Sequence, residues 1–293
     1  MSKHIHVVIN PAAGQAEPIL SYLNQAFNKK GVTWDVSITH KDGDALTQAR
    51  EAITKGVDVI CAYGGDGTVN EVAQAVYTTN IPMAIIPGGT ANIIAKELAI
   101  PANSMDAAAL VTSKEQTISK IDMGKCNDTL FLIRVSVGVL ARPVIDASRD
   151  LKNTYGKLAY GITTLKHIGK PTKAKYSLIL DGKRVTATGA SLIITNIGNV
   201  GIEGFSLSPT ISTTDGKFDI IRFKDTNLST LAALATNVLF KTEPDKVVRR
   251  WQAKKIMVTL PSKQQVLVDD VVLQSNKLSI EVLPKSINFI VPK

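Results

Sequence analysis

The sequence predicts an N-terminal α/β domain with a parallel sheet, followed by a C-terminal antiparallel β-sandwich domain. Up to about residue 122, apolar strand-like runs alternate with helical patterns. This order is typical of parallel sheets with right-handed crossovers. Beyond that point, short β-rich segments follow one another, separated by turn signals such as Asp181–Lys183 and Asp215–Lys217. Such a succession is typical of antiparallel sandwiches.

Length and composition are those of an ordinary globular chain. The 293 residues allow about two domains at roughly 100–200 residues each, and we expect them at 1–124 and 125–285. The chain is 44% hydrophobic and 20% charged, which is an ordinary globular composition. No apolar run approaches the roughly 20 residues that span a bilayer, and the polar start is unlike a signal peptide. Cys61 lies in an apolar run, which predicts a buried thiol and a reducing cytoplasm.

The first half contains the strands and helices of the α/β pattern. The expected strands are His4–Asn10, Val32–His40, Val57–Gly65 and Ile81–Gly89, and the expected helices are Pro18–Lys29, Asp44–Lys55, Gly67–Thr79 and Thr90–Leu98. Because Val57–Gly65 is nearly all apolar, we expect this strand to be covered on both faces.

The second half contains the segments of the sandwich. The expected strands are 130–138, 173–180, 190–196, 217–223, 254–260, 264–270, 278–283 and 287–291. Helical inserts are expected at Asn153–His167 and Leu228–Phe240. No Ser/His/Asp or Cys/His set stands out in the sequence, and we expect the scattered histidines to be structural or surface residues.

The charge is basic, with 34 Lys+Arg against 25 Asp+Glu and a net charge of +9. The excess gathers in two stretches, Arg149–Arg184 and Lys241–Lys255. Such clusters attract phosphates of nucleotides, nucleic acids or anionic membranes, and the alternative is an ordinary solvated surface. Aromatic residues make up only 5% of the chain and do not alternate with the lysines, which argues against single-stranded nucleic acid.

Three loops at strand-to-helix positions predict a binding site. They are Asn10–Gly14, Gly64–Thr68 and Pro87–Asn92. Parallel sheets bind ligands beyond the carboxyl ends of their strands, and all three loops should lie at that edge. One glycine-rich loop is weak evidence, and the Walker A and Rossmann motifs are absent, but three such loops at one edge indicate a site.

Two interpretations of the second loop compete. As structure, Thr68 and Glu71 fit a capping box, and Thr90 would cap the next helix. As function, the glycines let a phosphate chain touch backbone N–H groups at a helix N-terminus. Asp66 would repel phosphate unless a divalent cation mediates or the acid performs proton chemistry, and phosphoryl transfer needs both roles. The loop therefore predicts a nucleoside triphosphate site with Asp66 as metal ligand or base.

Asn10–Gly14, Gly64–Val72 and Pro87–Pro101, in this order and spacing, resemble the diacylglycerol kinase catalytic-domain superfamily, which includes soluble bacterial lipid kinases and the sphingosine and ceramide kinases. The resemblance covers nearly the whole chain and continues at Thr39, Tyr155–Tyr160, Ser208–Ile220 and Val266–Asp270. It implies a NAD kinase/diacylglycerol kinase-like layout: an α/β domain, then a β-sandwich, with nucleotide in the cleft. It also implies that a final strand at about 286–293 returns to the first domain.

The resemblance assigns nucleotide binding to 1–124 and the lipid substrate to 125–285. The residues expected to bind ATP are Asn10, Thr39, Gly64, Gly65, Asp66, Gly67, Thr68, Val69, Asn70, Glu71, Thr90 and Asn92. Asp66 would serve a Mg²⁺–phosphate centre, and Asp66, Asp269 and Asp270 form the candidate catalytic set. A divalent cation would bind the Asp215 carboxylate and nearby oxygens at Ser212 and Lys217, although a β-turn acid is the alternative for Asp215.

One departure from the family pattern concerns the proton acceptor. The family usually carries Asp-Gly-Glu near the carboxyl end, with the glutamate as candidate base for the lipid hydroxyl. Here the stretch is Asp269-Asp270-Val271, so either aspartate takes over or catalysis is impaired. Neighbouring strand side chains point to opposite faces, so only one aspartate should face the cleft unless the segment turns. Ile93 departs from a common aspartate after Asn92.

Three hypotheses follow. The first is an ATP- and Mg²⁺-dependent lipid kinase that phosphorylates a diacylglycerol-like or sphingoid hydroxyl. The second is a NAD kinase, which shares Gly64–Thr68, although Pro87–Leu98 fits the lipid branch better. The third is a catalytically impaired nucleotide- or lipid-binding homologue, favoured by Val271. The acceptor is not named by the sequence, because lipid pockets are generic apolar surfaces.

The resemblance and the charge together predict the partners. A lipid kinase without a transmembrane segment must dock reversibly, so we expect a cytoplasmic protein with salt-sensitive, peripheral contact to anionic membrane. We expect no nucleic acid partner and a role in phospholipid biosynthesis and lipid metabolism. A homodimer stays open beside a monomer.

Overall fold

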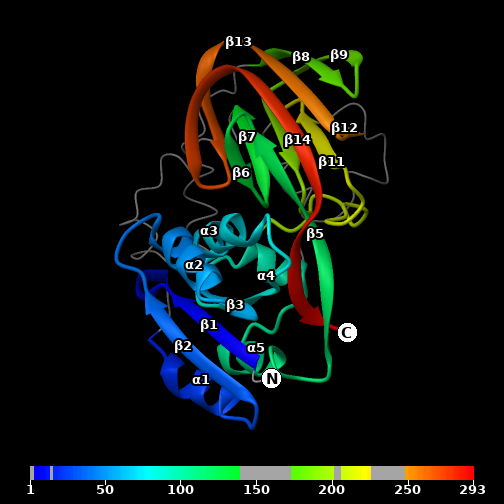
Figure 1. The fold of residues 1–293 in the computed structure, drawn as a ribbon. Helices are drawn as coiled ribbons and strands as arrows, with labels where there is room; N and C mark the ends of the chain where they lie inside the picture. Colours follow the sequence, from blue (N-terminus) through cyan, green and yellow to red (C-terminus); the bar gives the residue numbers. More distant parts are fainter. Residues whose placement is uncertain (1–2, 14–15, 139–172, 201–205, 226–247) are drawn as a thin grey trace. The chain divides into compact units, whose positions relative to one another are not determined.

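The computed structural model describes residues 3–13, 16–138, 173–200, 206–225 and 248–293. The chain forms two compact units, one of Met1–Asp122 with Pro284–Lys293 and one of Met123–Leu283 (Figure 1). The expected helices at 153–167 and 228–240 and the motif at 155–160 lie outside the described residues.

The first unit is built on a parallel sheet. Its strands are β1 (Lys3–Ile9), β2 (Val32–Ile38), β3 (Val59–Gly64) and β4 (Met83–Pro87), in the spatial order β4-β3-β1-β2. Val7 of β1 pairs with Val36 on one side and Cys61 on the other. Every residue of β3 and β4 is buried, as expected for strands covered on both faces.

In the described part of the first unit, five helices and one 3-10 turn flank this sheet. They are η1 (Pro11–Ala13), α1 (Ile19–Phe27), α2 (Asp44–Thr54), α3 (Asp66–Val76), α4 (Ile93–Glu97) and α5 (Ser104–Leu110). Helices α2 and α3 pack together, and so do α1 and α5, with the two pairs on opposite faces of the sheet (Figure 1). The buried stripe Ala45, Ala49 and Ala52 shows how α2 turns one face inward.

Helix α5 was not expected from the sequence, although its start carries a clear signal. Asn103 is the N-cap, and its side chain accepts the amide N–H groups of Met105 and Asp106 at 2.9 and 3.2 Å. An Asn-Ser pair before an alanine-rich run is a usual helix start.

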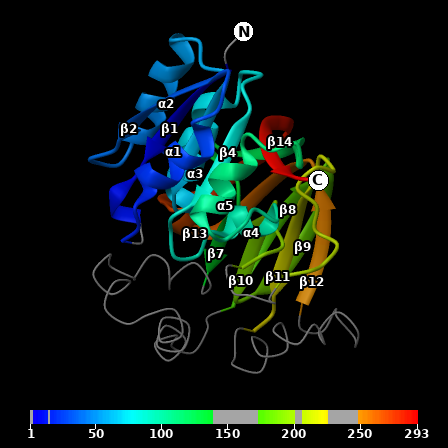
Figure 2. The ribbon, with the colours of Figure 1, turned by 90° about the horizontal axis from the view of Figure 1, so that it is seen from below.

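The carboxyl terminus completes the first unit. Phe289 of β14 (Val271–Pro292) pairs in parallel with Met83, so β14 ends beside β4 (Figure 2). Strand β5 (Gln116–Cys126) pairs with β14 as well. Asp122, which is fully buried, accepts the amide N–H of Lys285 at 2.7 Å.

The second unit is antiparallel and β-rich. Its remaining strands are β6 (Thr129–Phe131), β7 (Arg134–Gly138), β8 (Ala174–Leu180), β9 (Lys183–Gly189), β10 (Ser191–Thr195), β11 (Phe218–Phe223), β12 (Val248–Ala253) and β13 (Lys255–Val268). Strands β10, β11 and β12 lie side by side (Figure 2). Strand β7 pairs with both β10 and β13.

A register shift bends β13 and gives the unit its layers. Between Thr259 and Gln264 the pairing with β14 shifts; the residues before the shift pair with β8 and those after it pair with β7. The two halves therefore contribute to different layers around one core, in which Tyr176 and Val258 pack with Phe218 and Val266. The predicted fold, an α/β domain followed by a β-sandwich-like domain, is confirmed.

Candidate active site

The three loops predicted to share one edge of the sheet contact one another in the first unit. The amide of Asn10 donates to the carbonyl of Tyr63, and the amide of Gly88 donates to the carbonyl of Gly64, both at 2.9 Å. The Asn10 side chain donates through Nδ2 to the Thr68 hydroxyl at 2.9 Å. Because β1, β3 and β4 are parallel neighbours, their carboxyl ends bring these loops together.

Close packing between the loops accounts for two of the glycines. A Cβ atom at Gly64 would lie 2.6 Å from the Thr68 hydroxyl oxygen, and one at Gly89 would lie 2.5 Å from the Gly65 Cα. A Cβ atom at Gly65 would lie no nearer than 3.5 Å to the Gly89 Cα, an ordinary contact. A side chain at Gly65 would therefore not clash with other parts of the protein, so packing does not explain the glycine at this position.

The start of α3 differs from the expected capping box. The helix begins at Asp66 with Gly65 as an extended N-cap, and no side chain caps it. Thr68 lies in the first helical turn, where it is buried and accepts from Asn10. The capping-box prediction was wrong because the helix starts one turn before Thr68 could cap it.

Glu71 serves a different helix. Its carboxylate accepts the amide N–H groups of Gly43, Ala45 and Leu46 at 3.1–3.3 Å, at the start of α2. A carboxylate at this position satisfies amides that have no partner within the helix and complements the helix dipole. The contacts of Glu71 are thus those of a cap between helices.

The third loop is also longer than expected. Helix α4 begins at Ile93 rather than Thr90, and Thr90 is exposed. Asn92 has a φ of 47° and bonds both backbone groups of Gly89, which extends the loop to Asn92. The prediction that Thr90 caps this helix was therefore wrong.

Asp66 takes the capping role at α4. Its Oδ1 accepts the amide N–H of Ile94 at 3.0 Å, so this carboxylate joins the second loop to the third. Asp66 lies at the partly exposed start of α3, between partly exposed glycines and ahead of the buried Thr68. The acid in the middle of the glycine loop is held in place by a neighbouring helix start.

The other predicted nucleotide residues differ in what they can offer. Thr39 is 7% exposed and its amide donates to the carbonyl of Ile9, and the Val69 side chain is part of the core. Asn70 is 4% exposed, and its Oδ1 has no hydrogen-bond partner within the described parts of the chain. A buried acceptor without a donor is costly, so Asn70 is a place where a ligand or water donor is expected.

These features fit a nucleotide with phosphates. The first turn of α3 leaves backbone N–H groups without helical partners, and anions bind favourably at such helix starts. Gly65 leaves the backbone uncovered there, and the Asn70 Oδ1 could accept from a hydroxyl or amino group. Asp66 adds a negative charge that is compatible with phosphate when a divalent cation lies between them.

The acid pair of the second unit forms a turn rather than a strand. Asp269 and Asp270 connect β13 to β14, and Val268 pairs directly with Val271 across the turn. Asp269 has a φ of 49°, a left-handed conformation that aspartate tolerates better than most residues. Strand alternation therefore does not decide which of the two acids faces a substrate.

The environment of Asp269 restricts its chemistry. Its two carboxylate oxygens accept the amide N–H groups of Leu132, Ile133 and Arg134, with shortest distances of 2.8, 3.1 and 2.7 Å. Asp269 as a residue is partly exposed, but its carboxyl group is buried, and this burial raises the pKa of the group to about 7, against the opposing effect of these bonds. Asp270, in contrast, is exposed.

The predicted cation loop has turn contacts. Asp215 Oδ1 accepts the amide N–H of Lys217 at 3.0 Å, and the hydroxyls of Ser212 and Thr214 lie 3.3 Å apart. In the same unit, Arg250 donates to Asp219 and to the hydroxyls of Ser208 and Thr210. Arg250 also lines, with Thr210, a cavity of about 410 Å³.

A metal centre made by protein side chains alone is not seen in the described ranges. Within them, no group of three or more His, Cys, Asp or Glu side chains could hold a metal ion. A cation at Asp215 or Asp66 would therefore need backbone carbonyls, hydroxyls, water or substrate oxygens as further ligands. Magnesium in phosphoryl-transfer sites is usually held in this way.

Two polar clusters were not found from the sequence. His6 contacts Asp35 through Nδ1 and the Ser37 hydroxyl through Nε2 at 2.9 Å, so a Ser–His–Asp set joins β1 to β2. His6 lies on β1, and Asp35 and Ser37 lie two residues apart on β2, so the register between the two strands brings the three side chains together. The second is Asp122 within β5 with the Lys285 amide that it accepts, and nothing in the sequence indicated that this aspartate is completely buried.

Both parts of the chain are similar to known proteins. The diacylglycerol kinase catalytic domain matches residues 4–126, and the YegS C-terminal NAD kinase beta sandwich-like domain matches residues 133–291. A diacylglycerol kinase of Bacillus subtilis strain 168 is 30% identical over 273 residues, covering 91% of this chain and 89% of that protein. The crystal structure of a diacylglycerol kinase from Bacillus anthracis strain Sterne superposes with a TM-score of 0.78 and 26% identity, covering 99% of this chain and 97% of that one.

These matches define a kinase class with an α/β catalytic domain and a β-sandwich-like domain. The chain belongs to the diacylglycerol kinase family. Among the helices that the structure describes, none has the length and apolar character needed to cross a membrane.

Proposed function

We propose that this protein is an ATP- and Mg²⁺-dependent lipid kinase that transfers a phosphoryl group to the hydroxyl of a diacylglycerol-like or sphingoid lipid. The observation that carries this proposal is the loop cluster of the first unit, where Asp66 joins an open helix start to the third loop. Family membership supports the kinase class.

The residues of the first unit take distinct roles in this proposal. Bound ATP with a divalent cation supplies the phosphoryl group to be transferred. The amides of Gly67 and Thr68 bind phosphate oxygens, and Asn70 accepts from the nucleotide or an ordered water. Asp66 holds the cation or orients the lipid hydroxyl, while its bond to Ile94 fixes its position.

The second unit supplies the lipid side in the proposal. We assign the nucleotide to a domain near 1–124 with 286–293 and the lipid to a domain near 125–285. Asp270, exposed in the β13–β14 turn, takes the place of the missing glutamate as proton acceptor. Asp269 positions that turn through its three backbone contacts.

The test is an ADP-release assay with four acceptors: diacylglycerol, sphingosine, phosphatidylglycerol and NAD. We expect turnover with one lipid, dependence on Mg²⁺, and none with NAD. Transfer to NAD would replace the lipid kinase by a NAD kinase. ATP binding with Mg²⁺ and no transfer to any acceptor would exclude the kinase proposal.

A second candidate function is a catalytically impaired nucleotide- or lipid-binding protein. Two observations favour it: Val271 replaces the glutamate, and the Asp269 carboxylate is occupied by backbone amides. The assay distinguishes the two, because an impaired homologue binds ATP without releasing ADP above the blank.

The cellular setting is part of the same proposal. We expect a cytoplasmic enzyme of lipid metabolism and phospholipid biosynthesis that contacts anionic membrane reversibly and binds no nucleic acid. Of the two basic stretches, the described part includes Lys173–Arg184 and Arg249–Lys255. A divalent cation at Asp215 and a homodimer are further elements, tested by metal titration and by sedimentation.

A further inference from the structure

Within the described part of the second unit, one sheet face is exposed and basic. It consists of the outward side chains of β9, β8, the first part of β13 (255–259) and the facing part of β14 (277–281), which we call the outer face. Their inward neighbours, such as Tyr176, Val258 and Ile280, are in the core. Because strand side chains alternate, the intervening residues all point the other way.

The charge on the outer face is predominantly positive. Its exposed basic residues are Lys175, Arg184, Lys255 and Lys277, and its acidic residue is Glu281. Glu281 pairs with Lys255 across the strands, at one end of the face. The remaining polar positions are serine and threonine, so three basic residues are left without an acidic cross-strand neighbour on the face.

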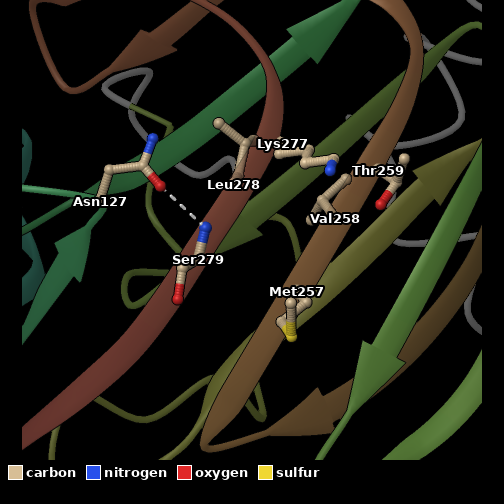
Figure 3. A pocket seen from close by; sticks show the side chains of 7 residues that line it. All are labelled: Asn127, Met257, Val258, Thr259, Lys277, Leu278 and Ser279. Atoms are coloured by element: carbon tan, nitrogen blue, oxygen red, sulfur yellow. Dashed lines mark hydrogen bonds between the residues drawn. The ribbon is translucent and has the colours of Figure 1, made fainter.

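The centre of the outer face is apolar. Met257 is 55% exposed, and it pairs with Ile179 of β8 on one side and Ser279 of β14 on the other. A cavity of about 250 Å³ opens beside it, lined by Asn127, Thr259, Lys277 and Ser279 among others. Figure 3 shows Lys277 extending from β14 toward Thr259 of β13.

Two exposed acids border the face: Asp181, in the β8–β9 turn, accepts the backbone amides of Lys254 and Lys255, and Asp128 is paired with a lysine. Asp128 follows Asn127 in the turn after β5 and lies 3.9 Å from the Lys125 amino group. Asn127 itself is fixed to β14, since its Oδ1 accepts the amide N–H of Ser279 at 2.9 Å. At the edge, Lys173 is paired with Asp225 at 2.8 Å and adds no net charge.

We infer that the outer face is a docking surface for an anionic lipid bilayer, with Lys175, Arg184 and Lys277 contacting lipid phosphates and Met257 entering the interface. This inference rests on the proposed function, because a lipid kinase must reach a substrate held in a membrane. A pleated face of four strands is broad enough to meet a bilayer surface. Basic side chains around an exposed apolar one are the combination that anionic membranes attract.

Other occupants fit the face less well. Single-stranded nucleic acid needs aromatic side chains for base stacking, and the outer face carries no aromatic residue. A second copy of the same basic face would be repelled in a symmetric dimer, because each copy would present the same positive charge.

The test compares two triple variants with equal loss of charge. The outer-face variant removes three positive charges of the outer face and is Lys175→Gln/Arg184→Gln/Lys277→Gln. The control variant removes three positive charges of exposed lysines in the first unit and is Lys30→Gln/Lys55→Gln/Lys114→Gln. Full-length proteins are sedimented with phosphatidylglycerol–phosphatidylcholine vesicles and with phosphatidylcholine vesicles at low and high salt. Each basic residue near an anionic surface strengthens binding about fivefold, so we expect about a hundredfold weaker binding for the outer-face variant.

A second substitution tests the apolar centre. Met257→Gln should weaken vesicle binding severalfold without changing the salt dependence, since it alters buried apolar area and not charge. Equal loss of binding in both triple variants would show a diffuse charge effect and overturn the inference. So would wild-type binding that is absent, salt-independent or equal on neutral vesicles, or a dimer that only the outer-face variant dissociates.

This experiment distinguishes a failure of the docking inference from a failure of the proposed kinase activity. Vesicle binding needs no turnover, so loss of binding in the outer-face variant supports docking even if no acceptor is phosphorylated. Activity on a short-chain lipid dispersed in detergent should be unchanged in the same variant. A variant that loses this activity as well has lost more than docking, and the inference then falls.

Discussion

Asp66 in the first unit and Asp269 in the second both accept backbone amides, but in different settings. Asp66 accepts the amide of Ile94 at a partly exposed helix start. Asp269 accepts from three consecutive residues in a hairpin turn, and burial raises its pKa to about 7. A carboxylate with both oxygens saturated by protein donors has little capacity left for a cation or substrate proton.

The comparison shows that an acid's neighbours decide its role. Three aspartates were candidates for catalysis on their sequence positions alone. Their contacts separate them: Asp66 is placed beside open helix amides, the Asp269 carboxylate is held by three backbone amides, and Asp270 is exposed. The predictions below test whether this division of roles is correct.

The largest effect is expected at Asp66. Asp66→Asn keeps an Oδ1 that accepts the Ile94 amide but removes the charge, so the loop should fold and phosphoryl transfer should fall at least about a hundredfold. The rate of ADP release at saturating lipid measures this. As a control, Asn103→Ala removes a helix cap at α5 and should lower the stability while the rate stays near wild type.

Activity of Asp66→Asn within a few-fold of wild type would remove Asp66 from the mechanism and leave it only the contact with α4. The comparison with Asp269 would then lose its basis, since both acids would be structural. Asp66→Ala would complete the test, because it also removes the bond to Ile94 and should be less stable than Asp66→Asn.

Asp269 should dominate the pH dependence of stability in the second unit. The raised pKa means that the native state binds more protons than the unfolded state between about pH 4 and pH 7. Stability from this group is therefore complete below about pH 4 and is lost as the pH rises through 7. Urea unfolding from pH 4 to 8 should show this decline, and Asp269→Asn should flatten it.

The same substitution should also lower the stability at low pH, where the wild-type group contributes most. An amide NH₂ in place of one oxygen faces backbone N–H donors, at a cost of roughly 1–3 kcal/mol for an unsatisfied buried group. Asp181→Asn is the matched control, since Asp181 occupies a similar left-handed turn position, accepts the amides of Lys254 and Lys255, and is exposed. A wild-type slope in Asp269→Asn would show that another group titrates.

Asp270 should have a smaller effect than Asp66. A well-placed general base contributes about 10²–10⁴ in rate, and a substitute one residue from the usual position should contribute about tenfold. Asp270→Asn should lower the turnover by that factor, while Asp128→Asn, in another exposed turn, should not. Val271→Glu should raise turnover. Wild-type turnover in Asp270→Asn would exclude it as the base.

The sequence allowed the fold to be predicted because hydrophobic pattern and turn signals agree along the chain. The buried runs of β3 and β4 and the helical stripe of α2 needed no tertiary information. The start of α4 could not be predicted without tertiary information. Hydrogen bonds between Asn92 and Gly89 extend the loop before this helix, and its capping carboxylate comes from Asp66, far away in sequence.

The same limit applies to the candidate site. Spacing predicted that the three loops would share a sheet edge, and the contacts of Asn10 with Tyr63 and Thr68 bring the first two together. The contacts of Asp269 and of His6 depend on strand register, which single positions do not reveal. The sequence left undecided whether Asp269 and Asp270 lie in a strand or in a turn. The pairing of Val268 with Val271 shows that they form a two-residue turn.

The smallest effect is expected at Glu71, which lies in the nucleotide motif but contacts the start of α2. Glu71→Gln leaves one side-chain oxygen for the three amides and removes the charge, so stability should fall by about 1 kcal/mol, as for other lost caps. The KM for ATP should stay at its wild-type value. Glu51→Gln, on the exposed face of α2, is the control and should change neither quantity. A tenfold higher KM for ATP at unchanged stability would instead assign Glu71 to the nucleotide, as its place in the motif first indicated.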